Sequence, residues 1–246
     1  MKNELLSFWD EATLDRAPFV HPRDANSISH IQSGISSYAE FLAAFEGGKL
    51  SRPALHLSLL PQPYHGDLDK AEILLLLSNP GLSACDYHVE QNYPAFREDL
   101  IASIRQERRD HVFLNPKWAW TSGFIWWESK LRDVAQVIAS ERFDGHYGRA
   151  LSDLARRVAS IELVPYHSFN FGSSGKLKSS VAARNFVASV DSSRTVIVTR
   201  GVTDWGLPDA ANIIKYPATQ ARSASLGLKT IGGRAILERY GIFPAA

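Results

Sequence analysis

The sequence predicts an α/β fold, a three-layer α/β/α arrangement whose central sheet is mostly parallel. Two observations carry this prediction. The run from Glu72 to Leu77 is short, continuous and apolar after its first residue, which is typical of a strand buried on both faces. Further along the chain, short apolar segments alternate with helical patterns, and strands separated by helices imply parallel crossover connections.

Taken in order, residues 1–60 are expected to form an N-terminal helical extension and a strand. A helix beginning near Ser37 stops at Gly47-Gly48, which is a plausible C-terminal cap. The alternating segment 53–60 favours a strand, and two prolines and a glycine in 61–71 favour a loop. The predicted helices that follow span 94–110, 128–142, 147–160, 182–193 and 231–241, and the predicted strands span 72–77, 161–166, 194–201 and 212–217.

The composition is that of an ordinary globular chain. The 246 residues are 45% hydrophobic and 22% charged, and no linker-like stretch divides them, so we expect a single domain over 1–246 with its core in 61–246. The net charge of +1 neither demands nor excludes a nucleic-acid partner. The acidic N-terminus is unlike a signal peptide, and no apolar run approaches the roughly 20 residues of a membrane helix. We therefore expect a cytoplasmic monomer without a membrane partner.

Several familiar motifs are absent. Cys85 is the one cysteine, which excludes an intrachain disulfide and a four-cysteine zinc site, and the eight histidines show no metal-binding spacing, so no metal is expected. The glycine-rich segment 169–180 lacks the spacing of a phosphate-binding loop. Four of the six tryptophans lie in a short stretch that is expected to be core, with a stacking platform for bases as the sharper alternative: Trp118, Trp120, Trp126 and Trp127.

Three strand ends are the candidate site. Ligands in parallel sheets bind beyond the carboxyl ends of the strands. Those ends are Ser78–Gly81, Pro165–His167 and Tyr216–Ala218.

Read in that order, the three ends resemble the uracil-DNA glycosylase superfamily, most closely its mismatch-specific uracil/thymine branch. "YHGDLDKAEILLLLSNPGL" is similar to the first signature, with Asn79-Pro80-Gly81-Leu82 matching its last four positions. Leu77 stands where that branch has Gly. "IIKYPATQARSASLGL" falls where the second signature lies, with Tyr216 in place of a common His. The resemblance spans about residues 62–241 and implies a glycosylase-like fold without a cofactor.

The resemblance implies that Asn79 is the catalytic residue. Its amide would orient the water that attacks C1′, because breaking a glycosidic bond passes through an oxocarbenium-like sugar and needs little nucleophilic power. Ser78, Pro80, Gly81 and Leu82 would line the base.

The resemblance also implies aromatic and polar contacts to a base flipped out of the duplex. The stacking candidates are Tyr87, Tyr93 and Phe96, although Phe96 is equally suited to the core; His167 and Asn170 would read the base edge. The expected partner is DNA that carries uracil, a mismatch or a damaged base. Its contacts would come from Lys176, Lys178, Tyr216, Pro217 and Arg222, with Arg222 as the wedge that fills the gap.

Two rival interpretations remain open. One is a nucleic-acid- or nucleotide-binding protein that has the same fold and no catalysis. The other is an unrelated α/β hydrolase that uses Asp86 and His88 as acid and base.

Overall fold

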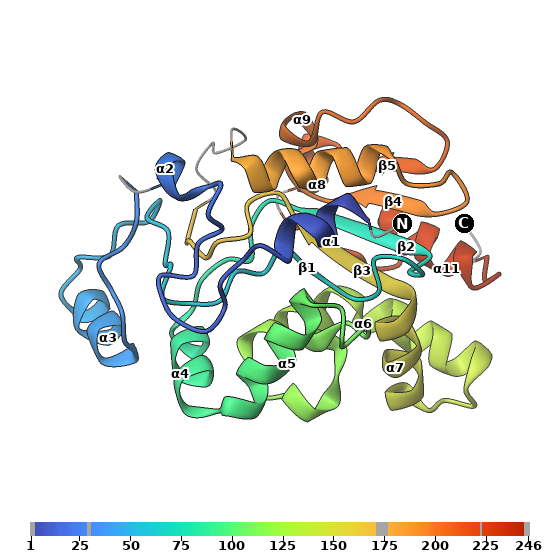
Figure 1. Cartoon of the computed structure of the whole chain (residues 1–246). Coiled ribbons are helices and arrows are strands. Elements are labelled where there is room, and N and C mark those ends of the chain that lie inside the picture. The colour runs from blue at the N-terminus through green and yellow to red at the C-terminus, as the bar shows by residue number, and fades with distance from the viewer. Residues whose placement is uncertain (1–2, 29–30, 171–176, 222, 244–246) are drawn as a thin grey trace. The chain divides into compact units, whose positions relative to one another are not determined.

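The computed structural model describes residues 3–28, 31–170, 177–221 and 223–243 (Figure 1). The chain forms two compact units, each assembled from three separate stretches. Unit 1 contains residues 1–64, 78–108 and 162–189, and unit 2 contains residues 65–77, 109–161 and 190–246. No linker separates the units, because the chain passes from one to the other at five points.

The structure contains a five-stranded sheet with the strand order β1-β3-β2-β4-β5. Its strands are β1 (Tyr64–His65), β2 (Ile73–Leu77), β3 (Val158–Glu162), β4 (Thr195–Val198) and β5 (Ile213–Lys215). The pairs β2–β4 and β4–β5 are parallel, with Ile73 opposite Thr195 and Val196 opposite Ile213. Every residue of β2 is buried, so the α/β prediction and the buried strand at 72–77 are both confirmed. Sheet and helices are compatible with the expected three layers.

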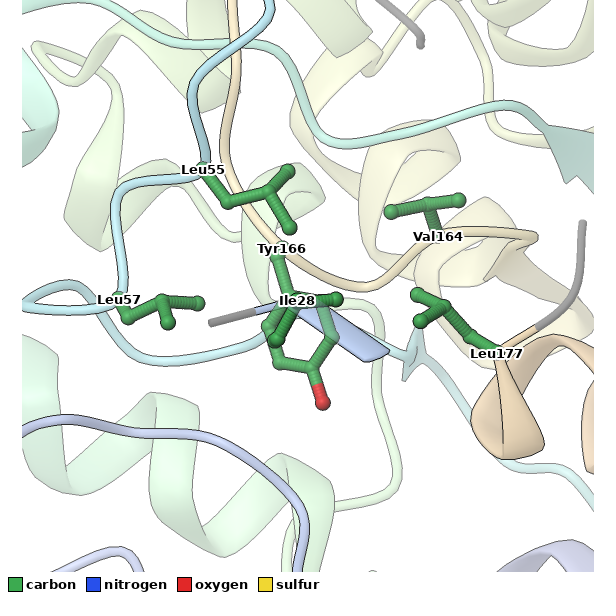
Figure 2. Packing of buried hydrophobic residues seen from close by; sticks show 6 residues of the cluster. All are labelled: Ile28, Leu55, Leu57, Val164, Tyr166 and Leu177. Carbon is green, nitrogen blue, oxygen red and sulfur yellow. The ribbon is translucent and has the colours of Figure 1, made fainter. Parts of the chain in front are cut away.

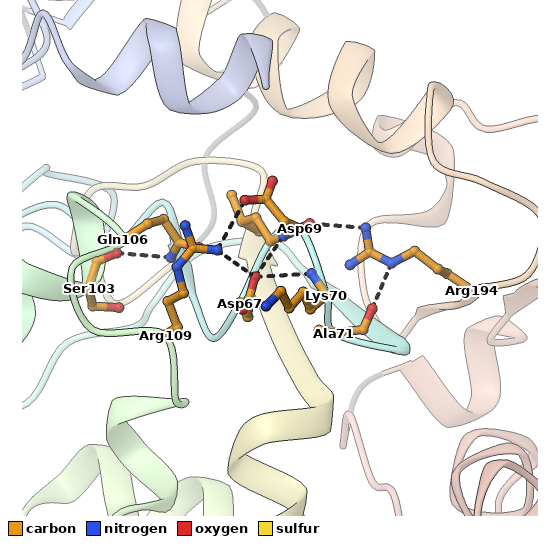
Figure 3. A network of polar contacts seen from close by, with 9 residues as sticks. Asp67, Asp69, Lys70, Ala71, Ser103, Gln106, Arg109 and Arg194 are labelled. Atoms are coloured by element: carbon orange, nitrogen blue, oxygen red, sulfur yellow. Dashed lines mark hydrogen bonds and ion pairs between the residues drawn. The ribbon is translucent and has the colours of Figure 1, made fainter. Parts of the chain in front are cut away.

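The loop before β2 is fixed by charged side chains (Figure 3). The Asp67 carboxylate accepts hydrogen bonds from the backbone N–H groups of Asp69 and Lys70 and from the guanidinium of Arg109, at 2.9 to 3.1 Å. Arg194, one residue before β4, donates to the Ala71 carbonyl at 2.6 Å. Because both ends of this loop are held, β2 enters the sheet in a defined register.

The helices of unit 2 pack on one another. Contacts join α6 to both α7 and α11. The helical segments of this unit are η1 (Val112–Leu114), η2 (Pro116–Trp118), α6 (Ser122–Arg142), α7 (Tyr147–Arg157), α9 (Val202–Trp205), α10 (Ala218–Ala221) and α11 (Ile231–Arg239).

Unit 1 is mainly helical, with α1 against α8, α3 against α4, and α4 against α5. One of its core clusters joins residues far apart in the sequence, among them Ile28, Leu55 and Tyr166 (Figure 2). Its helices are α1 (Glu4–Trp9), α2 (Ala25–Ile28), α3 (Tyr38–Glu46), α4 (Ala84–Asn92), α5 (Pro94–Ile104) and α8 (Lys178–Ala188). Within the described part of the chain, no helix is long and apolar enough to cross a membrane.

One expected strand is wrong, and another is shifted along the chain. Residues 53–60 form turns and a single bridge from Leu55 to Gln32, because their backbone groups bond to separate loops: Leu55 N–H to Ile31 and His56 N–H to His167. The strand expected at 161–166 is β3, which begins at Val158 directly after α7. No Gly or Pro marks that boundary, and β-branched Val158 and Ile161 are fully buried, which favours a strand there.

Candidate functional site

The loop after β2 begins in a fixed position. In unit 2, the indole N–H of buried Trp205 donates to the carbonyl of Leu77, the last residue of β2, at 3.1 Å. In unit 1, the buried Ser78 accepts a hydrogen bond through its carbonyl from the Val164 N–H at 2.9 Å. Gly81 has a φ of +75°, and apart from its chain neighbours no described residue has an atom within 4 Å of the position that a Cβ would occupy. A glycine there makes the tight turn without strain and leaves the backbone open on that side.

Asn79 is half-buried in this loop, and its side-chain amide is held by one residue. Its Nδ2 donates to the backbone carbonyl of Ser168 at 3.0 Å and to the Ser168 hydroxyl at 3.1 Å. A carbonyl oxygen only accepts, so the NH₂ end of the amide must face Ser168. Among the described residues, none donates to the opposite atom, Oδ1. Asn79 therefore offers a hydrogen-bond acceptor on a rigidly positioned amide.

Ser168 is itself fixed. It is buried, and its hydroxyl donates to the Asn170 carbonyl at 2.9 Å, which leaves the oxygen lone pairs for Asn79. We expect Ser168→Ala to lower the free energy of unfolding by about 1–2 kcal/mol, since the Asn170 carbonyl and the Asn79 amide each lose a partner. Urea denaturation measures the change. Ser152→Ala is the control, because in the described part of the chain that exposed hydroxyl bonds its own helix backbone alone; equal losses in the two variants would contradict the assignment.

His167 is a neutral ring that hydrogen-bonds to the backbone of this loop. Its Nδ1 is 2.9 Å from the Gly81 carbonyl, so Nδ1 carries the hydrogen, and Nε2 accepts from the Gln62 side chain at 3.2 Å. Burial lowers the pKa of His167, while the Asp86 carboxylate and the carbonyls of Gly81 and Leu60 oppose that change. His167 is 1% exposed, so its ring is a buried support for the loop.

A second buried histidine adjoins this group. His56 donates its backbone N–H to the His167 carbonyl at 2.9 Å, and its Nδ1 is 2.7 Å from the Tyr87 hydroxyl. Burial, and secondarily repulsion from His167 when that ring is protonated, lowers the pKa of His56 to about 4. Its Nε2 is buried with no hydrogen-bond partner among the described residues. The aromatic rings of Phe41 and Phe169 lie near it at centroid distances of 6.2 and 6.4 Å.

Glu90 is a buried acid on α4. It is 7% exposed, and its Oε2 accepts the Leu60 N–H at 2.9 Å. Burial raises the pKa of Glu90 to about 8; the Leu60 N–H and Arg97 lower it, and Asp86 adds to the rise. At neutral pH this carboxyl is mostly protonated.

The aromatic residues expected to stack on a base differ in exposure. Tyr87 has no exposed surface, and burial raises the pKa of its hydroxyl to about 12. Phe96 is 4% exposed and belongs to the core, which was one of its two expected roles. Tyr93 is 41% exposed, between α4 and α5. Of the three, Tyr93 alone presents its ring to solvent.

The remaining predicted residues of unit 1 lie around the loop or on the surface. Pro80 and Leu82 are half-buried beside Asn79, and Leu82 packs on the cluster of Phe41, Leu59 and Tyr87. Asn170 is exposed, as is Lys178 at the start of α8. Lys176 lies outside the described residues.

The third strand end belongs to unit 2. Tyr216 is 3% exposed, and its hydroxyl donates to the Ser225 carbonyl at 2.6 Å and lies 3.1 Å from the Thr230 hydroxyl. Its hydroxyl therefore braces the loop that follows β5. Pro217 is exposed just before α10, and Arg222 lies outside the described residues.

The rival pair Asp86 and His88 takes part in local helix contacts. The Asp86 carboxylate accepts the N–H and the hydroxyl of Ser83, forming the capping box that starts α4. The His88 ring contacts Tyr38 and Tyr93. Two positions apart on a helix, the side chains point to nearly opposite faces. In the described part of the chain, no group of three or more His, Cys, Asp or Glu residues is placed to hold a metal ion.

Sequence reasoning missed Ser168, His56 and Glu90. Ser168 directly follows the strand end that contains His167, which was the available signal. No sequence motif marks His56 or Glu90. Neither residue lies in a charged cluster or at the spacing of a known catalytic or metal-binding motif.

Together the fold and the site define an α/β protein with an amide anchored at the end of a buried parallel strand. The chain matches no protein-family model, no curated protein and no solved structure.

Proposed function

We propose that this protein is a DNA glycosylase that hydrolyses the N-glycosidic bond of uracil or of a damaged or mismatched base. The observation that carries the proposal is the Asn79 amide: both its bonds go from Nδ2 to Ser168, so Oδ1 is left as an acceptor in the loop after β2. The proposal includes a glycosylase-like three-layer fold, which the mostly parallel sheet supports.

In the proposed reaction the bond between C1′ and the base nitrogen breaks, and its electron pair leaves with the base. A water molecule, hydrogen-bonded to Asn79 Oδ1, adds to C1′ and loses a proton, and the base nitrogen gains one. The amide is a poor base, so its contribution is the orientation of the water. The open backbone at Gly81 gives the base a close approach, and main-chain N–H groups of the loop would bind its carbonyl oxygens.

Excision assays test this proposal. Purified protein is incubated with oligonucleotides bearing uracil, a G·T mismatch, hypoxanthine or an alkylated base, and alkali then converts abasic sites to strand breaks. We expect Asn79→Ala to lower the excision rate by about 100-fold, the effect of losing a positioned reactant. The matched control is Asn92→Ala, because among the described residues this exposed asparagine has side-chain hydrogen bonds to His88 alone.

Each rival function has its own outcome in the same assays. Binding without strand breaks, weakened in Lys178→Gln, would favour a non-catalytic nucleic-acid-binding protein. Hydrolysis that survives Asn79→Ala and disappears in His88→Ala would favour the unrelated hydrolase. Excision at equal rates in the wild type and Asn79→Ala would refute the role of Asn79.

A further inference from the structure

A group of basic and aromatic side chains lies in unit 2 around the start of α6. Trp120 is 45% exposed just before the helix, and Ile125 is 56% exposed on its first turns. Large apolar side chains exposed in this way mark contact surfaces when they occur together with other binding groups. We call this group the tryptophan surface. Its residues are Lys117, Trp120, Ile125, Trp126, Lys130 and Arg200, and the buried Trp118 and Trp127 pack against its rings.

The tryptophans are held in fixed orientations by buried neighbours. Trp120 lies edge-on to Trp118, with centroids 6.3 Å apart, and Trp118 is 4% exposed. Trp126 lies perpendicular to Trp127 at 5.0 Å, and Trp127 is 5% exposed. Because their partners are in the core, the outer rings lose little freedom when something stacks on them.

Cations lie over these rings. The Lys117 ammonium is 4.6 Å from the ring centre of Trp118. Two cations converge on Trp126: the Lys130 ammonium at 5.3 Å and the Arg200 guanidinium at 6.0 Å. Cation–π attraction at partly exposed sites is worth only about 0.5–1 kcal/mol, and two like charges over one ring repel each other.

Lys130 lies close to a second cation, Arg200, over the same ring. Burial and the neighbouring charge of Arg200 lower the pKa of Lys130. No carboxylate among the described residues pairs with Lys130, whereas the adjacent Glu128 is neutralised by Arg132 at 2.5 Å. An anion placed between Lys130 and Arg200 would relieve this repulsion.

We propose that the tryptophan surface binds single-stranded DNA, with phosphates on Lys130, Arg200 and Lys117 and unpaired bases stacked on Trp120. Aromatic platforms combined with cations are the way in which proteins hold single strands without reading their sequence. A membrane surface would also engage cations beside exposed rings, so binding to vesicles of anionic lipid without binding to the oligonucleotide would overturn the inference. The choice of DNA as the ligand rests on the proposed function. The binding itself does not involve Asn79.

Fluorescence anisotropy tests the proposal, with a labelled, undamaged oligothymidylate about 20 nucleotides long, several times the length of a short binding site. We expect Trp120→Ala to weaken binding about 5- to 100-fold, the effect of losing one stacked base. Lys130→Gln should weaken binding and reduce the slope of log affinity against log salt by about 0.7, the value for one phosphate contact on a single strand.

Two substitutions serve as matched controls. Lys70→Gln removes an exposed lysine of unit 2 in the loop before β2, and Phe243→Ala removes a ring that is 77% exposed. Both should bind like the wild type. Unchanged affinity in Trp120→Ala, an unchanged salt slope in Lys130→Gln, or absence of single-strand binding would each overturn this inference. Excision that depends on Asn79 would still stand in those cases, and loss of excision with binding intact would overturn only the proposed function.

Discussion

Replacing Gly66 with alanine is expected to lower the free energy of unfolding by about 3–5 kcal/mol, or to prevent folding altogether. Gly66 follows β1 with a φ of +93°, and a Cβ built there would lie 2.4 Å from the Val158 carbonyl oxygen and 2.8 Å from the Ala159 Cα. Both atoms are backbone atoms of β3, so neither can move aside as a flexible side chain would. Urea denaturation and the yield of folded protein measure the effect.

Gly145→Ala is the control that separates the effect of the Cβ clash in Gly66→Ala from the effect of a left-handed backbone. Gly145, also in unit 2, has a φ of +81°, but apart from its chain neighbours none of the residues that the structure describes has an atom within 4 Å of its Cβ position. Its substitution should cost only the roughly 1–2 kcal/mol of a left-handed alanine. The same urea midpoint for both variants would show that β3 does not approach Gly66 closely.

The second large effect is a loss of stability between pH 6.5 and 8 that depends on Glu90. Burial raises the pKa of Glu90 from 4.5 to about 8. In this window the unfolded carboxyl is ionised while the folded one keeps its proton, so the folded state binds more protons and stability falls as pH rises. The slope approaches about 1.4 kcal/mol per pH unit, which amounts to about 2 kcal/mol across the window.

Glu90→Gln should abolish most of this decline. The neutral amide keeps an oxygen for the Leu60 N–H and never ionises, so the variant should be more stable than the wild type at pH 8. Free energies of unfolding from urea titrations at several pH values measure the difference. Glu98→Gln is the control, since Glu98 is exposed on α5 and its loss should leave the decline in place. A wild-type protein with constant stability across this window would contradict the protonated Glu90.

Below pH 6.5 four histidines oppose the trend set by Glu90, which itself continues down to about pH 4.5. Burial lowers the pKa of these histidines, so the unfolded chain binds more protons at these sites than the folded chain does, and their contribution to stability falls with falling pH. For His56, whose pKa is about 4, this loss extends from pH 6.5 down to about 4. The four residues are His21, His56, His111 and His167.

Local patterns accounted for the elements that were predicted well. The apolar run that forms β2 requires burial on both faces wherever it lies, and Pro94 sets the start of α5 because its missing N–H suits a first helical position. The same patterns failed at 53–60, where alternation reflected burial among several loops without a strand partner. A pattern of apolar residues indicates which side chains are buried. It does not indicate which backbone groups hydrogen-bond to one another.

By itself the sequence determined the α/β class, the buried β2 and the turn that places Asn79 after it. These follow from interactions between residues close along the chain. Only the tertiary structure decided that Ser168, 89 positions away, hydrogen-bonds to the Asn79 amide. It also decided that the side chains of Glu90 and His56 are buried away from solvent. Hydrogen bonds and desolvation of this kind depend on which distant segments meet, and that is settled by the packing of the whole unit.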